Sequence, residues 1–451
     1  MQTIDPDEPG RAAATPTTDL PATESAGSGA LGPPTRVAVI GQGYVGLPMA
    51  ARAVEAGMHV VGFDVDSTRV AALRAGTSFI EDVADAELAR MLGTGRYLPS
   101  DDPSDLLGFE VAVVSVPTPL RDHAPDLTYV EDAARVLSEH LSPGCLVVLE
   151  STTYPGTTEE AFIPLLEKGS GMQAGVDFRV GYSPERIDPS NATWGFRNTP
   201  KIVSGLDEAS AAAVGAFYER LVDHVVPVRT IREAELAKLF ENTFRHVNIA
   251  LVNELAMYCH SMGIDVWSVI DAAATKPFGF MRFTPGPGVG GHCLPIDPSY
   301  LSWQIRRLVG KTFRFIDIAN DINDHMPDYV VERVNAHLNR DRKSVNGSNI
   351  LVLGLAYKRN SGDVRQSPAL DVVAKLLELG AQVRVVDPLV RPGGVPGGVR
   401  LVADTAAEFE ASDLVLVLTD HDVIDWELVE TYADRTLDTR NRTRSAAVDR
   451  L

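Results

Sequence analysis

Residues 36–66 decide the fold of this chain; they read RVAVIGQGYVGLPMAARAVEAGMHVVGFDVD. The run RVAVI is typical of a buried strand, GQGYVG of a tight turn, and LPMAARAVEAG of a helix that ends at Gly57. HVVGFDVD predicts a second strand, which ends in Asp64. Further strands alternate with helices up to residue 229, so the sequence predicts a parallel, doubly wound sheet.

The turn in this unit has the glycine spacing of a dinucleotide-binding site. Gly41, Gly43 and Gly46 permit the tight turn and the close approach of a pyrophosphate, and the following helix offers amide donors to it. Asp64 would accept hydrogen bonds from a ribose 2′-OH and repel a 2′-phosphate, which favours NAD over NADP. The alternative is an α/β turn that binds no cofactor.

Composition bounds the class of protein. A chain of 451 residues is too long for one core. Its three cysteines include no CxxC pair, which argues against a disulfide framework and a zinc site, and for a reducing compartment; no metal site is expected. A net charge of −20 disfavours nucleic acid as a partner, so an anionic ligand would need a locally basic site.

The two ends of the chain look unlike the rest. Residues 1–35 are rich in Pro, Ala, Thr, Ser and Gly, which predicts a disordered tail that is not a secretory signal. We expect the last residues, 441–451 (NRTRSAAVDRL), to fray. No run of about twenty apolar residues occurs, so we expect no membrane span and a cytoplasmic protein.

The remaining pattern divides the chain into three ordered domains. An NAD-binding Rossmann domain is predicted over residues 36–229. Thr230 and Glu233 have capping-box spacing and begin a long helical run that ends at Gly263, within a mostly helical domain over 230–340. The α/β rhythm returns over 341–451. The expected fold class is therefore α/β, with two Rossmann-like doubly wound domains joined by a helical domain that has a long central helix.

A glycine-rich loop, TPGPGVGGHCLPIDPSYL (284–301), carries Cys293. A thiol in such a loop can attack a substrate carbonyl, although a free cysteine is often simply buried. Asp297 precedes Pro298 and a helical run, so it suits a helix N-cap, a catalytic carboxylate, or both. Three other residues are expected to be structural: His292, Cys145 and Cys259.

Two further groups bear charge that a site could use. Lys238 and Asn242 are four residues apart and share one face of the long helix, although a helical lysine is by default solvated. The stretch 354–368 (GLAYKRNSGDVRQSP) gathers Lys358, Arg359 and Arg365 after a strand, which suits a phosphate or nucleotide; ordinary surface charge is the alternative.

Eight motifs in order resemble the UDP-glucose/GDP-mannose dehydrogenase family, from about Arg36 to near Arg442. They are GQGYVGL, GFDVD, VSVPTP, ESTTYPGT, YSPER, ELAKLFENTF, PGPGVGGHCLPIDP and GLAYKRNSGDVRQSP. Within the family, the wording is most similar to bacterial dehydrogenases of UDP-N-acetylhexosamines such as UDP-N-acetylglucosamine. The resemblance implies an NAD-binding domain, a helical domain that forms a dimer core, and a UDP-binding domain, so we expect a homodimer or a higher homo-oligomer. It also implies oxidation of a sugar C6 alcohol to the carboxylate with two NAD.

The resemblance also implies roles for single residues. Cys293 would be the nucleophile that forms a thiohemiacetal and then a thioester, and Asp297 would assist proton transfer and water activation. Lys238 and Asn242 would stabilise the oxyanion and hold the substrate. Thr152 and Glu185 would organise catalytic water and protonation. The expected cofactor contacts are Gly41, Gly43, Tyr44, Val45, Gly46, Asp64, Thr118 and Thr152. The expected substrate contacts are Glu185, Lys238, Asn242, Arg282 (from a neighbouring subunit), Gly290, Lys358 and Arg365.

One departure bears on the substrate. Members acting on UDP-glucose commonly carry a carboxylate four residues after the position of Glu185, where this chain has Pro189. This favours an N-acetylated sugar over UDP-glucose. A two-electron hydroxyacid dehydrogenase is a second alternative, disfavoured by the second α/β domain and the GGHC loop. A non-catalytic nucleotide-sugar-binding protein is a third, disfavoured by the presence of Cys293, Lys238 and Asp297.

Overall fold

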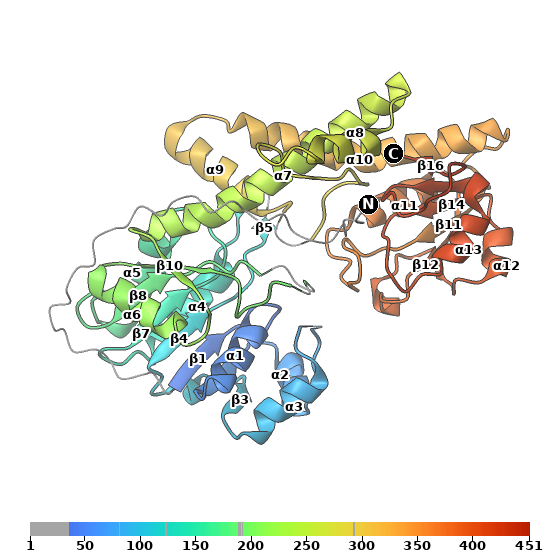
Figure 1. Ribbon diagram of the computed structural model, residues 1–451. Coiled ribbons are helices and arrows are strands. Elements are labelled where there is room, and N and C mark those ends of the chain that lie inside the picture. The colour runs from blue at the N-terminus through green and yellow to red at the C-terminus, as the bar shows by residue number, and fades with distance from the viewer. Residues whose placement is uncertain (1–35, 81, 122–123, 188–190, 192, 292–293) are drawn as a thin grey trace. The chain divides into compact units, whose positions relative to one another are not determined.

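The structure is a computed structural model that describes residues 36–451 except 81, 122–123, 188–190, 192 and 292–293 (Figure 1). The expectations about the N-terminal tail, His292, Cys293 and Pro189 therefore concern residues outside the described set. The predicted fold class is confirmed: two Rossmann-like sheets flank a helical segment with a long helix.

The first sheet has the strand order β10-β9-β8-β7-β4-β1-β2-β3. Its strands are β1 (Arg36–Ile40), β2 (His59–Phe63), β3 (Tyr97–Ser100), β4 (Val111–Val114), β7 (Leu146–Leu149), β8 (Arg179–Tyr182), β9 (Lys201–Gly205) and β10 (Val225–Pro227). A small hairpin pairs β5 (Leu120–Arg121) with β6 (Ala124–Pro125). The helices are α1 (Gly46–Glu55), α2 (Ser67–Arg74), α3 (Asp85–Gly93), α4 (Thr128–Ser138), α5 (Ile163–Ser170) and α6 (Glu208–Tyr218).

Alternating residues of β1 explain the helices on both faces of this sheet. Val37 and Val39 belong to one apolar cluster, together with Leu47 of α1. Ala38 and Ile40 belong to another, which contains residues of α4 and α5. Because successive side chains of a strand point to opposite faces, a continuous apolar strand must be covered on both sides.

The sheet differs from the all-parallel prediction at one step. β8 and β9 are antiparallel, with Gly181 opposite Gly205, whereas the other pairs of this sheet are parallel. No helix lies in the described part of residues 183–200, and antiparallel neighbours need no crossover helix. The start of β9 consequently lies at the sheet edge where β7 and β8 end.

The long helix α7 (Ile231–Met262) begins and ends where the sequence predicts. The Thr230 hydroxyl accepts a hydrogen bond from the Glu233 N–H at 3.1 Å, and Gly263 adopts a φ of 68° after the last turn. The Glu233 carboxylate accepts a hydrogen bond from the Arg229 N–H at 3.1 Å, next to this cap. The other helices of this segment are α8 (Val266–Ala274), α9 (Asp297–Val309) and α10 (Arg314–Arg340).

The second sheet is parallel in each pair, with the order β13-β12-β11-β14-β15-β16. Its strands are β11 (Asn349–Leu353), β12 (Gln382–Val386), β13 (Arg400–Leu401), β14 (Leu414–Val417), β15 (Thr436–Asp438) and β16 (Asp449–Arg450). Its helices are α11 (Pro368–Glu378), α12 (Ala406–Glu410) and α13 (Trp426–Thr431). Met326, Val330 and Val334 of α10 also pack in this core. The predicted boundary at residue 340 stays a prediction.

The expectation that the C-terminus frays is wrong. Residues of β16 pair with β15, and the Leu451 side chain is buried. The Asp449 carboxylate accepts hydrogen bonds from Arg333 and Arg340 of α10 at 2.7 and 2.8 Å. These ion pairs hold the last strand in place, although its sequence is polar and short.

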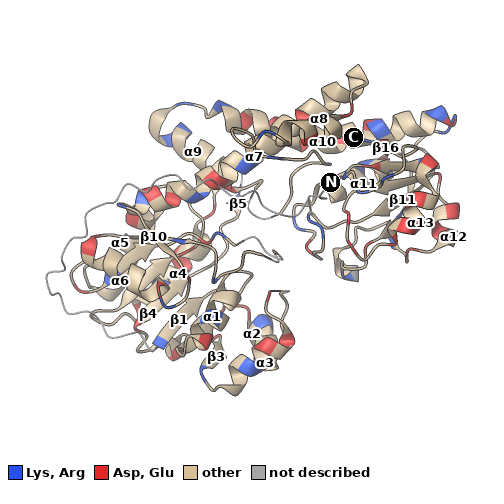
Figure 2. Cartoon of the chain, in the orientation of Figure 1, with Lys and Arg blue, Asp and Glu red and all other residues tan. Residues whose placement is uncertain are grey.

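Figure 2 shows acidic residues on α3, α12 and α13. Among the described residues, no helix combines the length and the apolar character that crossing a membrane requires.

Candidate active site

One large cavity gathers the predicted site residues. Its volume is about 1290 Å³, larger than the roughly 300–1,000 Å³ typical of a pocket for one small ligand. It therefore has room for a dinucleotide and a second ligand together. The predicted residues on its wall are Gly41, Gly43, Tyr44, Val45, Asp64, Thr118, Thr152, Glu185, Lys238, Asn242, Arg282, Gly290, Asp297, Lys358 and Arg365.

The three glycines after β1 are required for different structural reasons. Gly41 has a φ of 91°, and a Cβ on it would lie 2.4 Å from the Ser115 carbonyl oxygen. A Cβ on Gly46 would lie 1.9 Å from the Gly41 carbonyl oxygen, which explains why this glycine packs in the turn and is absent from the cavity wall. A Cβ on Gly43 would meet nothing within 4 Å, so this position leaves space on the cavity side.

Asp64 follows β2 and presents an organised carboxylate to the same cavity. It accepts hydrogen bonds from the Gln42 N–H at 2.8 Å, the Asp66 N–H at 3.0 Å and the Arg69 guanidinium at 2.8 Å. A glycine turn, a helix N-terminus and a fixed acidic residue at the end of the next strand fit an NAD molecule. Gly41, Gly43 and the start of α1 would hold its pyrophosphate, and Asp64 its ribose.

Thr118 and Thr152 are tied to each other and to the helical segment. The Thr118 hydroxyl donates to the Thr152 carbonyl at 2.8 Å. The Tyr300 hydroxyl of α9 donates to the Thr118 carbonyl. These bonds fix the loops after β4 and β7 against α9 beside the cavity.

Lys238, Asn242 and Asp297 form a polar group on the cavity wall, in which the side chains of Lys238 and Asp297 are buried. Lys238 is 8% exposed, so its interpretation as a solvated surface lysine is wrong. The Asn242 amide donates to the Asp297 carboxylate at 2.5 Å. Burial raises the pKa of Asp297 to about 6, against the opposing effects of Lys238 and Asn242. This value suits a group that exchanges protons near neutral pH.

The N-cap interpretation of Asp297 is also wrong. The residue is the first of α9, and no side chain caps that helix; its carboxylate instead engages Asn242 of α7. Asp297 is thus available to the cavity rather than to its own helix.

Glu185 lies beyond β8 and is held from three sides. Its carboxylate accepts from the Arg186 and Ile187 N–H groups at 2.6 and 2.7 Å, and from the Lys201 ammonium at 2.8 Å. Burial alone would raise its pKa, but Lys201 and these hydrogen bonds lower it. Lys201 also bonds Glu150 at 2.7 Å. The sequence analysis missed this pair, because only the reversal of β9 brings Lys201 to this edge.

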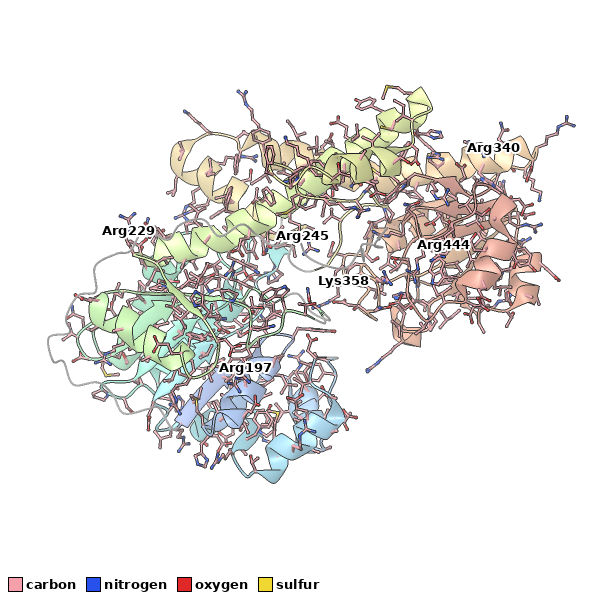
Figure 3. All side chains as sticks on the ribbon, viewed as in Figure 1. Arg197, Arg229, Arg245, Arg340, Lys358 and Arg444 are labelled. Atoms are coloured by element: carbon pink, nitrogen blue, oxygen red, sulfur yellow. The ribbon has the colours of Figure 1, made fainter. Side chains whose placement is uncertain are left out.

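The basic loop after β11 reaches the cavity as well. Figure 3 labels Lys358 of this loop and Arg245 of α7, both of which line the cavity. Arg365 pairs with Asp363 at 2.6 Å, and its guanidinium lies 4.6 Å from the centre of the Tyr44 ring. Arg245 was not predicted, since its position on α7 resembles that of any exposed helical arginine.

The glycine-rich loop packs directly on the basic loop. The Gly291 N–H donates to the Arg365 carbonyl at 3.2 Å, and a Cβ on Gly290 would lie 2.6 Å from the Gln366 carbonyl oxygen. Arg282 lines the cavity and pairs with Asp271 at 2.9 Å on an exposed surface. Gly291 and Leu294, on either side of the undescribed pair 292–293, are both on the cavity wall.

The other cysteines are core residues, as predicted. Cys145 and Cys259 are buried, and burial raises the pKa of the Cys145 thiol to about 11. Neither belongs to the cavity wall. In the described part of the chain, no group of three or more His, Cys, Asp or Glu side chains could hold a metal ion.

Three family models match consecutive parts of the chain, and all carry the name UDP-glucose/GDP-mannose dehydrogenase family. The NAD binding domain matches residues 35–222, the central domain 232–325 and the UDP binding domain 351–445. The NAD binding match agrees with the cofactor predicted from Gly41–Gly46 and Asp64.

Similar proteins cover most of the chain. A UDP-N-acetyl-D-mannosamine dehydrogenase of Pyrococcus horikoshii is 37% identical over 398 residues, 87% of this chain and 92% of that protein. A UDP-N-acetyl-D-glucosamine 6-dehydrogenase of Pseudomonas aeruginosa is 40% identical over 359 residues, 79% of this chain and 83% of that protein. A solved structure of a Pyrococcus horikoshii UDP-D-ManNAc dehydrogenase superposes with a TM-score of 0.83 at 35% identity, covering 92% of this chain and 98% of that chain.

Proposed function

This chain belongs to the UDP-glucose/GDP-mannose dehydrogenase family, and from that premise we propose that it oxidises the C6 alcohol of a UDP-N-acetylhexosamine to the carboxylate. The reaction removes four electrons and uses two NAD per sugar. One observation carries the proposal: a single cavity contains the NAD turn, the Lys238–Asn242–Asp297 group and the basic loop with Lys358.

In the proposed mechanism, a bound NAD would supply the hydride acceptor for each of the two oxidation steps. Asp297 takes up the proton of the C6 hydroxyl, a role that suits a pKa of about 6. The Lys238 ammonium, buried on α7, stabilises the developing oxyanion, which in a site closed to water is worth several kcal/mol.

Cys293 supplies the covalent step of the proposal. Its thiolate adds to the aldehyde carbon and forms a thiohemiacetal, whose oxidation gives a thioester. Water then adds to the thioester carbon, and the thiolate leaves as the carboxylate forms. Glu185, whose carboxylate accepts from Lys201, would receive protons from that water. This role for Cys293 rests on the GGHC sequence motif and on family membership.

The substrate class rests on two supports. The similar proteins of Pyrococcus horikoshii and Pseudomonas aeruginosa carry the names of dehydrogenases for UDP-N-acetylhexosamines. Pro189 stands where enzymes acting on UDP-glucose commonly have a carboxylate. UDP-glucose remains the alternative substrate.

The test is an NADH assay with UDP-GlcNAc, UDP-ManNAc, UDP-GalNAc and UDP-glucose side by side. The expected result is turnover of an N-acetylated sugar with two NADH per acid formed. A clear preference for UDP-glucose would overturn the substrate, and one NADH with accumulating aldehyde would overturn the four-electron reaction. Cys293→Ser is expected to stop acid formation; wild-type turnover in this variant would remove the thiol from the mechanism.

We also propose that two copies associate through α7. Apolar side chains recur along this helix at intervals of four and seven residues, and Phe240, Leu251 and Met262 are each about 60% exposed. A second copy of the chain would cover this stripe, since such apolar surface is usually buried at an interface. The residues of the stripe are Leu236, Phe240, Phe244, Leu251, Tyr258 and Met262.

Light scattering on the intact protein tests the association. The wild type is expected to have twice the mass of one chain, and Phe240→Asp with Leu251→Asp the mass of one chain. The control is Leu107→Asp, an exposed leucine (66%) away from the stripe, which should leave the mass unchanged. A monomeric wild type would overturn the proposal.

A further inference from the structure

A buried ion cluster lies at the edge of the first sheet, beside the cavity. Lys201, the first residue of β9, has its ammonium 2.7 Å from Glu150 and 2.8 Å from Glu185. The side chains are almost fully enclosed: Lys201 is 4% exposed, Glu150 0% and Glu185 10%. Glu150 and Glu185 both line the cavity, whereas Lys201 lies behind them.

The reversal of β9 creates this cluster. Glu150 directly follows β7, and Glu185 lies three residues after β8, at the carboxyl ends of two parallel strands. β9 runs antiparallel to β8, so its first residue lies at the same edge. In a parallel β9, the first residue would lie at the opposite edge of the sheet. The antiparallel step thus places a cation directly behind the two carboxylates of the cavity wall.

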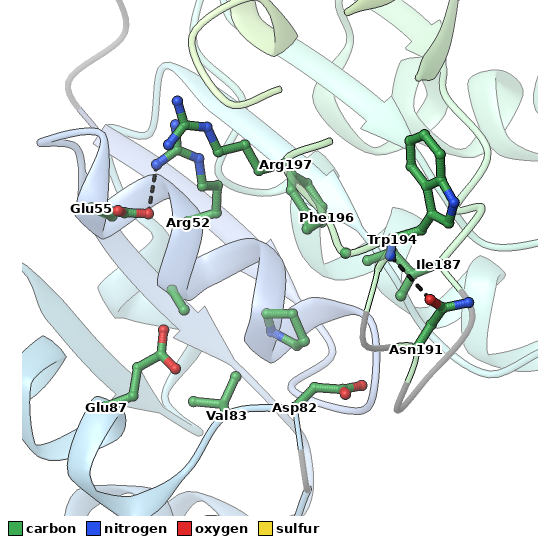
Figure 4. Close-up of a pocket in the computed structure, with 13 residues that line it drawn as sticks. Arg52, Glu55, Asp82, Val83, Glu87, Ile187, Asn191, Trp194, Phe196 and Arg197 are labelled. Carbon is green, nitrogen blue, oxygen red and sulfur yellow. Dashed lines mark hydrogen bonds and ion pairs between the residues drawn. The ribbon is translucent and has the colours of Figure 1, made fainter. Parts of the chain in front are cut away.

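Aromatic rings shield this cation from water. The Lys201 ammonium lies 5.2 Å from the centre of the Tyr218 ring and 5.4 Å from that of Phe196. Phe196 also lines a smaller pocket of about 240 Å³ beside α1 (Figure 4). With water excluded on these sides, the attraction between the ammonium and the carboxylates is stronger than at a surface.

The two carboxylates are bonded unequally. One Glu185 oxygen accepts from two backbone N–H groups, and the other accepts from Lys201. One Glu150 oxygen accepts from Lys201 and from the Tyr218 hydroxyl at 2.6 Å. The other Glu150 oxygen is buried and has no hydrogen-bond partner among the described residues.

One ammonium cannot neutralise two buried carboxylates. Burial raises the pKa of Glu150 in spite of Lys201, whereas Lys201 and the backbone N–H groups lower that of Glu185 in spite of burial. Lys201 therefore favours the ionised form of Glu185 more strongly than that of Glu150. The titratable groups that act on the two carboxylates are Lys201 of β9, Tyr218 of α6, Tyr182 of β8 and Lys238 of α7.

We propose that Lys201 is a positioning residue, which fixes the Glu185 carboxylate as an anion at the cavity wall, and that Glu150 weakens this hold by competing for the same ammonium. The proposal rests on the proposed function, in which Glu185 receives protons during thioester hydrolysis. It assigns opposite effects on Glu185 to Lys201 and to Glu150, the second carboxylate that contacts the Lys201 ammonium.

The test is the pH profile of thioester hydrolysis, the step assigned to Glu185, followed in three variants as carboxylate release from the preformed thioester. Lys201→Met removes the cation, so the acidic limb of the hydrolysis rate is expected to move up by about one to three pH units, with the KM for the UDP-sugar changed less than threefold. Lys201→Arg keeps a cation and should restore most of the wild-type profile. Glu150→Gln leaves the cation to Glu185 alone, so the acidic limb should move down. Lys343→Met, which removes an exposed ion pair with Asp413, is the matched control.

Two outcomes would overturn the proposal. One is an acidic limb that stays in place in both Lys201→Met and Glu150→Gln; the other is a shift in the same direction in both. If Lys201→Met does not fold, Glu150→Gln decides alone, because it preserves volume and removes no cation.

Infrared absorption of protonated carboxyl groups, recorded without substrate, separates this proposal from the proposed function. As the pH is lowered, the band that Glu150→Gln lacks should appear at a higher pH than the band that Glu185→Gln lacks, and Lys201→Met should raise the pH at which the Glu185 band appears. A Glu185 band that appears at the same pH in the wild type and in Lys201→Met would overturn the positioning role. Absence of NADH with every UDP-sugar would overturn the proposed function, and the infrared test would still stand.

Discussion

The turn after β1 and the turn after β11 have the same backbone design. Each strand is followed by a glycine with positive φ, 91° at Gly41 and 82° at Gly354. Each glycine N–H donates to the carbonyl at the end of the neighbouring strand, Phe63 at 2.8 Å and Val386 at 2.9 Å. The two sheets thus begin their crossovers with one geometry, although the sequences around them show no obvious repeat.

An aspartate follows the neighbouring strand in each sheet, Asp64 after β2 and Asp387 after β12, and the two have different surroundings. Asp64 accepts from two N–H groups and Arg69, and lies on the cavity wall. Asp387 also accepts from backbone N–H groups, of Leu355, Ala356, Leu389 and Val390, and is contacted by His421 at 3.2 Å. It is absent from the cavity wall. The same backbone geometry can therefore present a carboxylate to a ligand or enclose it within the protein, and the neighbouring side chains decide between the two.

The second α/β domain contributes to the cavity through the loop that follows its turn, not through its aspartate. Lys358, Ser361 and Arg365 of this loop line the cavity, and the His421 ring accepts the Asn360 N–H at 2.9 Å. His421 thus contacts Asp387, whereas the equivalent carboxylate of Asp64 lies on the cavity wall. The same ring also accepts a hydrogen bond from the basic loop.

The largest expected effects test whether the two turns are equivalent. A Cβ on Gly41 or on Gly354 would lie 2.4 Å from a backbone carbonyl oxygen, of Ser115 or Thr419. With the cost of positive φ added, Gly41→Ala and Gly354→Ala should each lower the free energy of unfolding by about 4 kcal/mol. Urea unfolding measures this, with Gly43→Ala as the control that stays within about 0.5 kcal/mol. A loss of stability in only one of the two variants would show that the turns are not equivalent.

The next pair of variants tests the difference between the aspartates. Asp387→Asn should lower the free energy of unfolding by about 3 kcal/mol, because it breaks a buried network. Asp64→Asn should cost less than about 1 kcal/mol of stability but raise the Kd for NAD about tenfold. Thermal unfolding and calorimetric titration with NAD measure the two effects. The assignment would be reversed if Asp387→Asn weakened NAD binding at unchanged stability.

A smaller effect concerns Asp297, which lies between the two domains in the chain. With a pKa of about 6, it is protonated at lower pH and cannot accept a proton there. The rate of NADH formation should therefore fall about tenfold for each pH unit below 6. Stopped-flow measurement between pH 5 and 8 checks this, and a pH-independent rate in wild type would remove Asp297 as the base.

The smallest expected effect on ligand affinity concerns His421. His421→Ala removes the acceptor of the Asn360 N–H, a loss of about 1 kcal/mol, and should raise the KM for the UDP-sugar about fivefold. The KM for NAD should stay unchanged. His325→Ala, at an exposed position on α10, is the control. Equal changes in both KM values would mean that His421 serves the whole protein rather than the loop.

Short-range patterns in the sequence were enough for much of the fold and part of the site. The turn at Gly41–Gly46 and Asp64 lies within one βαβ unit, and its geometry follows from glycine spacing and strand periodicity. The start and end of α7 follow from Thr230 and Gly263. Lys238 and Asn242 line one cavity because helix periodicity alone puts them on one face.

Tertiary structure decided where the charges act. Whether Asp297 caps its helix or meets Asn242, 55 positions earlier in the chain, depends on how α9 packs on α7. The direction of β9 decides that Lys201 reaches Glu150 and Glu185, and the ion pairs of Asp449 decide that the last strand joins its sheet. The physical reason is the same in each case. Periodicity and turn chemistry act between near neighbours in the chain, whereas burial and pairing of charges depend on contacts between distant segments.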